Sequence, residues 1–263
     1  MKCNICDKNM KITAKNEKYI FYKCKSCGFY TSDGLGEEKP YDYDDYETFD
    51  AEEIKFDEYV DNAAKMLKHK FRLLGYNPKS FLDIGCSEGV WVKAFSIISN
   101  GRSSGIEVSE PKVERGKLNG LEIGNYNEIK GKYEFIYLRH VIEHISDPKE
   151  FLEFIAEKYL QSNGVICIET PNNNGIIDIL IGNRIKDYRF YKELYPPTHV
   201  VGFSAKTFKY MSNYEIVYST TYGHNDSMWY FDVDRKKEHP LVNYILTKLS
   251  LNTNIFVIMK RVY

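Results

Sequence analysis

The chain has 263 residues, and its 36 lysines and arginines nearly balance 37 aspartates and glutamates. Such a chain has no overall positive field to attract a polyanion, and residues 33–58 are rich in acidic side chains, so nucleic acid is disfavoured as a partner. Apolar runs near 165–168 and 176–181 are too short to cross a bilayer, and the N-terminus lacks the apolar core of a secretory signal. We expect a cytoplasmic protein with no membrane partner.

The N-terminal segment contains two Cys-x-x-Cys pairs, Cys3/Cys6 and Cys24/Cys27. The apolar residues within 12–22 predict a short β-hairpin between them. Two knuckles around a hairpin are typical of a zinc ribbon, in which four thiolates surround one tetrahedral ion. Because such an ion has no open position, we expect structural zinc without catalysis. The alternative is a pair of redox dithiols, which is disfavoured because nothing resembling a thioredoxin unit surrounds the cysteines.

An acidic, tyrosine-rich connector over 33–50 separates the ribbon, residues 1–32, from a larger domain over 51–263. The expected strands are 80–84, 103–108, 121–123, 135–138, 165–169, 214–221 and 254–261, and the expected helices are 60–74, 90–98, 110–119, 147–159, 176–181, 204–211 and 241–249. Alternating strands and helices build a parallel sheet with helices on both faces, so the fold class is α/β. The segments 172–204 and 223–240 follow strands, where we expect substrate contacts.

The first strand of the alternation runs into a glycine turn, Phe81-Leu82-Asp83-Ile84-Gly85-Cys86-Ser87-Glu88-Gly89. Gly85 and Gly89 let the backbone approach a ligand, and the next helix offers free N–H groups. Glu107 follows the second strand, about twenty residues after Asp83, where a carboxylate accepts the ribose hydroxyls of a nucleoside. The alternative for Glu107 is a solvated acid at a strand end. Together these features predict a nucleoside cofactor.

The pattern resembles class I S-adenosylmethionine-dependent methyltransferases from about Phe81 to Arg261. Besides the glycine turn, the resemblance rests on Gly105-Ile106-Glu107, on 133–148 with its core Val141-Ile142-Glu143-His144, on Ile168-Glu169-Thr170-Pro171-Asn172, on Pro197-Thr198-His199 and on Phe203-Ser204. It implies a Rossmann-like, seven-stranded, mostly parallel sheet with an antiparallel final strand. The ribbon and the connector with Tyr43 and Tyr46 resemble those of bacterial members that methylate sugars or other small metabolites.

The resemblance also implies an S-adenosylmethionine site. Its candidate residues are Asp83, Gly85, Cys86, Ser87, Gly89, Glu107, Asn125, Tyr126 and Leu138. The turn residues would cradle the methionine part, Glu107 the ribose, and Asn125 or Tyr126 the adenine edge. Ser87 stands where the family usually has glycine, although a serine can still satisfy a helix start. For Cys86 the alternative is a small buried apolar residue.

Methyl transfer from a sulfonium is an in-line displacement, so a base is needed only to take a proton from an oxygen or carbon nucleophile. The candidates are His140, Glu143 and His144, after the strand 135–138, with His199 as a further polar group. His140 and His144 would share one face if their segment were helical. A structural role at a helix cap or the rim of the sheet is the alternative. The same four residues could hold a catalytic metal, since some O-methyltransferases bind an ion through Glu-x-x-Glu-His, and nitrogen-rich ligands suit zinc or iron.

These features favour O-methylation of a small polar metabolite, such as a sugar or a nucleotide-sugar. N- and C-methylation stay open, although ketosugar C-methyltransferases of similar build have a tyrosine where Val141 stands. Aromatic and basic side chains that could bind a sugar ring, or merely pack at the surface, are Tyr188, Arg189, Tyr191 and Tyr195. One alternative is an RNA or protein methyltransferase that recognises its substrate through the ribbon. Another is a cofactor-binding scaffold without catalysis.

Overall fold

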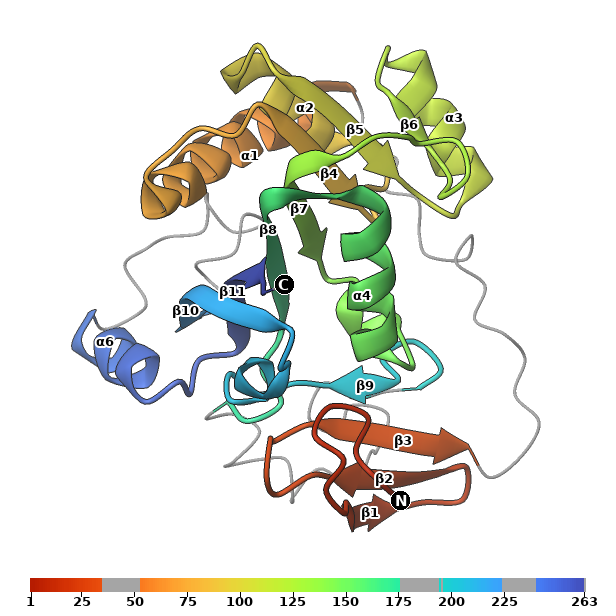
Figure 1. Ribbon diagram of the computed structural model, residues 1–263, viewed down its shortest axis with the longest axis vertical. Coiled ribbons are helices and arrows are strands. Elements are labelled where there is room, and N and C mark those ends of the chain that lie inside the picture. The colour runs from red at the N-terminus through yellow and green to blue at the C-terminus, as the bar shows by residue number, and fades with distance from the viewer. Residues whose placement is uncertain (35–52, 176–193, 195, 224–239, 263) are drawn as a thin grey trace. The chain divides into compact units, whose positions relative to one another are not determined.

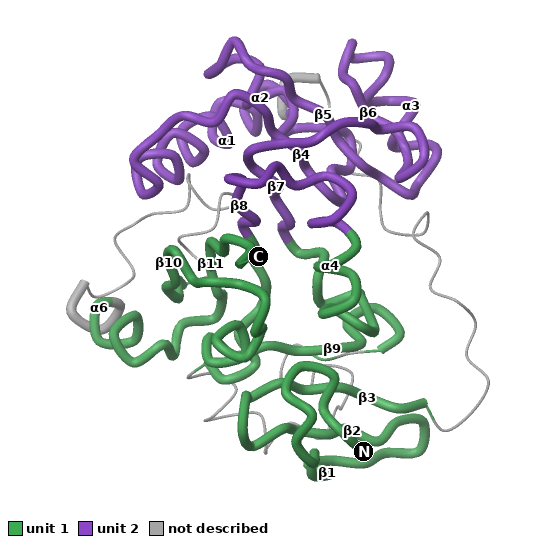
Figure 2. Tube along the Cα trace, in the orientation of Figure 1, with its two compact units in different colours: residues 1–41, 140–154, 168–263 green, residues 42–139, 155–167 purple. Residues whose placement is uncertain are grey.

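The computed structural model describes residues 1–34, 53–175, 194, 196–223 and 240–262 (Figure 1). Several expectations lie outside these residues: the connector 35–50 with Tyr43 and Tyr46, the helix 176–181, and Tyr188, Arg189, Tyr191 and Tyr195. The chain forms two compact units (Figure 2). Unit 1 comprises Met1–Tyr41, His140–Phe154 and Ile168–Tyr263, and unit 2 comprises Asp42–Arg139 and Ile155–Cys167. None of the helices that the structure describes is both long and apolar enough to span a membrane.

Seven strands form one mostly parallel sheet. They are β4 (Ser80–Ile84), β5 (Arg102–Ile106), β6 (Ile123–Gly124), β7 (Tyr133–Arg139), β8 (Leu160–Pro171), β10 (Tyr214–Tyr222) and β11 (Asn254–Arg261). Their order is β10-β11-β8-β7-β4-β5-β6. β4 pairs in parallel with β5 and β7, and β5 with β6, whereas β11, the last strand in the chain, is antiparallel to β10. The expected Rossmann-like α/β sheet with an antiparallel final strand is confirmed.

The core of unit 2 is aromatic and joins helices to the sheet. Its helices are α1 (Glu53–Leu74), α2 (Val90–Ile98) and α3 (Glu110–Leu118). Phe71 on α1 lies edge-on to Phe95 on α2 and to Phe135 on β7, with ring centroids 6.0 and 5.4 Å apart. Phe81 on β4 stacks on Phe95 at 5.0 Å. These buried rings pack α1 and α2 against β4 and β7 and so fix the strand that leads into the glycine turn.

The ribbon belongs to a second sheet in unit 1. β1 (Lys11–Lys15) and β2 (Tyr19–Lys23) form the expected antiparallel hairpin. The sequence did not indicate the two further strands, β3 (Tyr30–Gly34) and β9 (Val201–Gly202), which complete the order β1-β2-β3-β9. The ring of Phe29 packs edge-on against Phe203 at 5.6 Å. The ribbon therefore shares both a sheet and a buried contact with the segment that follows His199.

Three further elements differ in detail from the expected ones. Asp147 caps α4 (Pro148–Tyr159) as expected, because its Oδ1 accepts the Glu150 N–H at 3.1 Å. β8 begins directly after α4, so Gly164 lies inside this strand, where an added Cβ would come within 2.9 Å of the Tyr133 carbonyl. The helix expected over 204–211 is only a 3-10 turn, η3 (Thr207–Tyr210). The described residues also form the 3-10 turn η1 (Ile142–His144) and the helix α6 (Pro240–Lys248).

Candidate functional site

The turn between β4 and α2 has a left-handed backbone at three positions. The φ angles are 69° at Gly85, 49° at Ser87 and 90° at Gly89. A Cβ at Gly89 would lie 2.5 Å from Ile123 Cδ1, so only glycine fits this N-cap of α2. No side chain caps α2. The expectation that Ser87 satisfies the helix start is therefore wrong, because Ser87 precedes the cap by two residues.

Backbone donors hold the carboxylate of Glu107 on both oxygens. Oε2 accepts the Ser87 N–H at 2.9 Å, and Oε1 accepts the N–H groups of Val108 and Ser109 at 2.8 and 3.0 Å. The residue is 8% exposed, so the solvated-acid alternative is wrong. Glu107 ties the loop after β5 to the glycine turn after β4, which places an acceptor group at the rim of the turn.

Asp83 carries an unsatisfied buried oxygen. The side chain is 2% exposed, and its Oδ2 has no hydrogen-bond partner within the described ranges. Burial raises the pKa of Asp83 well above its usual value; the charge of Arg139 opposes this rise and that of Glu107 adds to it. A buried acceptor in this state suits the amino group of an amino-acid ligand such as the methionine part of S-adenosylmethionine.

Two cations lie near the same end of β4 and β7, and the sequence did not single them out. The Arg139 guanidinium lies 5.8 Å from the centre of the Trp91 ring. Lys70, only 4% exposed, places its Nζ 5.7 Å from the rings of Trp91 and Tyr137. The one available signal for Arg139 was its position directly before His140. These two cations could bind the carboxylate of a ligand, and the aromatic faces beside them stabilise their positive charge.

The other candidate cofactor residues have contacts that a purely structural role would also explain. Cys86, 4% exposed, packs in an apolar cluster with Val92, and Leu138 on β7 is fully buried. Both agree with core packing as well as with contact to a ligand. Asn125 is exposed, and its side chain is used within its own turn: Oδ1 accepts the Asn127 N–H at 2.8 Å and Nδ2 donates to Glu128. Tyr126 is half-buried, and its carbonyl accepts a hydrogen bond from the Tyr159 hydroxyl. The Tyr126 ring is therefore a better candidate than its carbonyl for contact with an adenine.

Unit 1 contains a second polar group, centred on Glu143. Its carboxylate is 2% exposed, with Oε1 3.2 Å from His140 Nδ1 and Oε2 accepting the Thr170 hydroxyl at 3.0 Å. Burial raises the pKa of Glu143, but the hydrogen bond from His140 and the charges that His140, His199 and His144 carry when protonated outweigh burial and lower it to about 2. Thr170 was not among the candidates, although it lies in the segment 168–172 that carries the resemblance. Its hydrogen bond to Glu143 depends on the position of β8 in the sheet.

His144 and His199 lie face to edge beside Glu143. Their ring centroids are 4.9 Å apart at 78°, and the ligand atoms of all three residues lie within 4.8 Å of one another. His144 Nδ1 is 2.9 Å from the Thr198 carbonyl, which can only accept, so this nitrogen must donate and Nε2 keeps the lone pair. His140 precedes η1 and so does not share a helical face with His144; it reaches the group through Glu143 instead.

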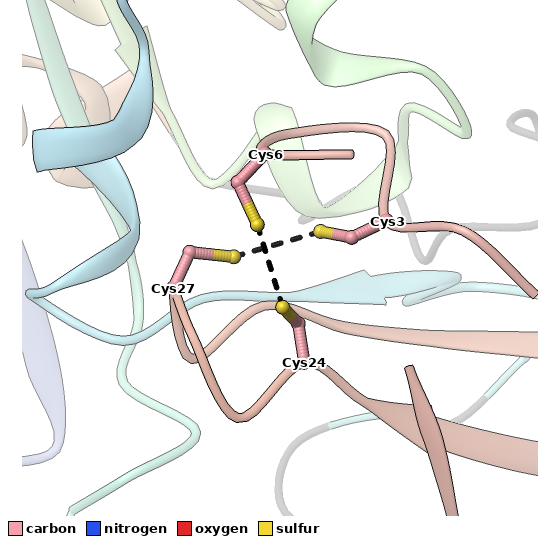
Figure 3. Close-up of side chains that lie close together, drawn as sticks. All are labelled: Cys3, Cys6, Cys24 and Cys27. Carbon is pink, nitrogen blue, oxygen red and sulfur yellow. Dashed lines mark hydrogen bonds between the residues drawn. The ribbon is translucent and has the colours of Figure 1, made fainter. Parts of the chain in front are cut away.

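The four ribbon cysteines converge on one point, as Figure 3 shows. Cys3 and Cys27 have their Sγ atoms 3.5 Å apart, as do Cys6 and Cys24. A tetrahedral zinc with Zn–S bonds of about 2.3 Å separates its sulfurs by about 3.8 Å, whereas a disulfide requires about 2.05 Å. The hydrogen bond between Cys3 and Cys27 lowers the pKa of Cys3 to about 5 and raises the pKa of Cys27, and burial raises the pKa of Cys6, so it is the geometry of the sulfurs that indicates a metal. The donor set fits zinc.

Comparisons with known proteins agree with this geometry. The profile of the methyltransferase domain family matches residues 56–213, more than half of the chain. No curated protein matches. The fold is similar to the plantazolicin methyltransferase BpumL in complex with a monoazolic desmethylPZN analog and SAH (15% identity, 80% of this chain and 86% of that chain, TM-score 0.50). It is also similar to coclaurine N-methyltransferase bound to N-methylheliamine and SAH (15% identity, 75% of this chain and 72% of that chain, TM-score 0.52). A third similar structure is an S-adenosylmethionine-dependent methyltransferase from Clostridium acetobutylicum ATCC 824 (12% identity, 77% of this chain and 92% of that chain, TM-score 0.50).

Proposed function

Because this chain belongs to the methyltransferase domain family, as a class I S-adenosylmethionine-dependent methyltransferase, we propose that it methylates an oxygen of a small polar metabolite such as a sugar or a nucleotide-sugar. The observation that carries the proposal is the group of buried Glu143, buried His199 and half-buried His144, which offers base and carboxylate within 4.8 Å. An alcohol needs such a base, because its proton must leave as the new bond forms.

In this proposal the cofactor lies at the turn after β4. Bound S-adenosylmethionine supplies an electrophilic methyl group on a sulfonium. Asp83 accepts a hydrogen bond from the amino group with its unsatisfied Oδ2, and Arg139 offers charge to the carboxylate. Gly85 and Gly89 leave room for the ligand at the backbone, and Glu107 receives the ribose hydroxyls. Cys86, Ser87, Leu138, Asn125 and Tyr126 remain proposed contacts.

The proposed base is Nε2 of His144. The Thr198 carbonyl holds the hydrogen on Nδ1 and so presents the Nε2 lone pair. The proton of the acceptor hydroxyl moves to Nε2, and the Glu143 carboxylate stabilises the imidazolium that results. Thr170 and His140 position that carboxylate through their hydrogen bonds, and His199 supports the orientation of the His144 ring through their T-shaped contact.

A metal-assisted variant of the reaction is the second candidate. It is favoured by one observation: a carboxylate and two imidazoles, from Glu143, His144 and His199, form a group that could hold an ion. A divalent ion there would lower the pKa of a bound acceptor hydroxyl, replacing the histidine base. Chelation separates the two candidates. A base mechanism keeps its rate in a chelator that leaves the ribbon metal in place, and a metal mechanism loses it.

We further propose that the ribbon, residues 1–32, binds zinc as a structural module, that 33–50 connects it to the catalytic domain 51–263, and that the protein acts in the cytoplasm. The fit of the four sulfurs supports the zinc. A ribbon that recognises RNA or protein remains the alternative function, and the overall charge of −1 argues against RNA.

The test uses labelled S-adenosylmethionine with pools of sugars, nucleotide-sugars and other metabolites. We expect His144→Gln to lower turnover by about 10²–10⁴-fold, the usual contribution of a positioned base, with unchanged affinity for S-adenosylhomocysteine. His69→Gln, an exposed histidine on α1, is the matched control and should change neither quantity. Full turnover in His144→Gln would contradict the base assignment. Labelling of RNA or protein but of no metabolite would favour the alternative function.

A further inference from the structure

Unit 1 contains a cavity of about 470 Å³ where the second cysteine knuckle meets η3 and the end of α6. Four lysines line it: Lys23 and Lys25 from the ribbon, and Lys206 and Lys209 from the segment around η3. None of the described residues that line the cavity is acidic; the others are glycine, alanine, leucine, serine or asparagine. A hollow with four positive charges and no negative one differs from the balanced charge of the chain as a whole.

Three of the four lysines have no carboxylate partner within the described part of the chain. Lys25, Lys206 and Lys209 are exposed, and no ion pair joins them to an acid among the residues that the structure describes. Lys206 places its Nζ 5.7 Å from the Tyr210 ring, and Lys23 lies 4.8 Å from the Tyr30 ring. Like charges around one hollow repel each other, and a bound anion would offset that repulsion.

Hydrogen bonds join the two segments that carry these lysines, the second cysteine knuckle and the start of η3. The hydroxyl of Thr207 donates to the Cys27 carbonyl at 3.1 Å, and the Ser204 hydroxyl lies 3.5 Å from the same oxygen. Gly28 has a φ of 76°, and a Cβ there would come within 2.2 Å of Ser204 Oγ. The knuckle and the start of η3 therefore pack too closely for any other residue at position 28. This contact holds lysines from distant parts of the chain around one space.

We propose that this cavity binds the diphosphate of the acceptor, so that the substrate is a nucleotide-linked sugar rather than a free one. The inference rests on the proposed methylation of a small metabolite. About 300–1,000 Å³ is usual for a small-molecule site, so the cavity has room for a diphosphate and part of what it carries. β9 joins Ser204, in the wall of the cavity, to His199, five residues earlier in the sequence. The anion site and the proposed acceptor site thus belong to one unit and one short segment.

Titration calorimetry of the full chain with inorganic pyrophosphate tests the site directly. We expect one pyrophosphate per chain, and at least tenfold weaker binding in the double variant Lys25→Gln/Lys206→Gln. The matched control, Lys79→Gln/Lys130→Gln, removes two exposed lysines of unit 2 and should bind like the parent. Since all four side chains are exposed, the variants should keep the parental melting temperature. No binding, or equal loss in both double variants, would overturn the proposal.

Two further measurements separate this inference from the proposed function and from an RNA site. S-adenosylhomocysteine affinity is measured on the same samples: if it is normal while pyrophosphate fails to bind, the diphosphate site is wrong and the methyltransferase function stands. Absence of S-adenosylhomocysteine binding would instead count against the proposed function alone. A single-stranded RNA oligonucleotide that binds more tightly than pyrophosphate, through the same lysines, would overturn the assignment to a small ligand.

Discussion

The backbone N–H of Ser87 donates to Glu107 Oε2 at 2.9 Å, so the acid that we propose as the ribose acceptor also holds the glycine turn. A carboxylate has about four acceptor positions, and three of those on Glu107 are used by backbone donors. Two ribose hydroxyls therefore cannot both bind unless one backbone bond is released. The Ser87 bond is the one between the two loops, and we expect it to lengthen when the cofactor binds.

Replacing Glu107 tests this double role. Glu107→Ala removes the ribose acceptor and the clamp on the turn, so we expect S-adenosylhomocysteine affinity to fall by about 1–3 kcal/mol, roughly 5- to 150-fold. Glu107→Gln keeps an acceptor oxygen and should lose less. Calorimetry measures both, with the exposed Glu110→Gln as control. Unchanged affinity in Glu107→Ala would show that the ribose assignment is wrong.

Ser87 is a second test of the turn, because its φ of 49° is unfavourable for any residue with a Cβ. Ser87→Gly removes that strain and keeps the N–H that Glu107 accepts, so cofactor affinity should be retained. Ser87→Val adds β-branching to a left-handed position and should lower the free energy of unfolding by about 1–2 kcal/mol. Chemical denaturation measures both variants. Equal stability of the two would mean that the turn relaxes freely.

The buried Asp83 carboxyl should raise the affinity for the cofactor and lower the stability of the protein without it. Because the pKa of Asp83 is raised in the folded state, its contribution to stability is fully present below the unfolded value near 3.8 and is lost as the pH rises through the folded value. We therefore expect Asp83→Asn to unfold at a higher temperature than the parent at pH 7, and the difference to vanish near pH 4. Its affinity for S-adenosylhomocysteine should fall at least tenfold. Lower stability at pH 7 would contradict this account of Asp83.

Loss of the zinc that we propose in the ribbon should change the surroundings of His199 but not those of the glycine turn after β4. β3 pairs with β9 through Tyr30 and Gly202, and Val200 donates its N–H to the Glu143 carbonyl at 3.0 Å. Cys24→Ser should lower metal content, measured by elemental analysis, and shift the His199 imidazole signals in NMR spectra. S-adenosylhomocysteine affinity should stay within about twofold, because its proposed ligands lie in unit 2. Unchanged His199 signals in metal-free protein would rule out the coupling.

Much of the fold could be read from spacing alone. The sequence pattern located β4, α2, α4 and β11 to within a few residues, because β4 and β11 are continuous buried runs and the two helices repeat apolar residues on one face. The strands β3 and β9 escaped notice, since Tyr30–Gly34 is mostly polar and Val201–Gly202 is too short for any pattern. β3 is a strand because it pairs with β2 along its whole length, and β9 is a strand because its two residues pair with β3. Short pairings of this kind carry no local signal.

The sequence by itself determined which chemical groups the protein carries: two pairs of cysteines, an acid near the end of each of two strands, and the histidines His140, His144 and His199. These groups can be recognised from the spacing of residues because each lies in a strand, turn or helix that forms from a short stretch of the chain. Only the tertiary structure decided which groups meet. Thr170 reaches Glu143, His199 joins His144, and lysines from the ribbon and η3 enclose one cavity, since hydrogen bonds and charges act through space and do not depend on separation along the chain.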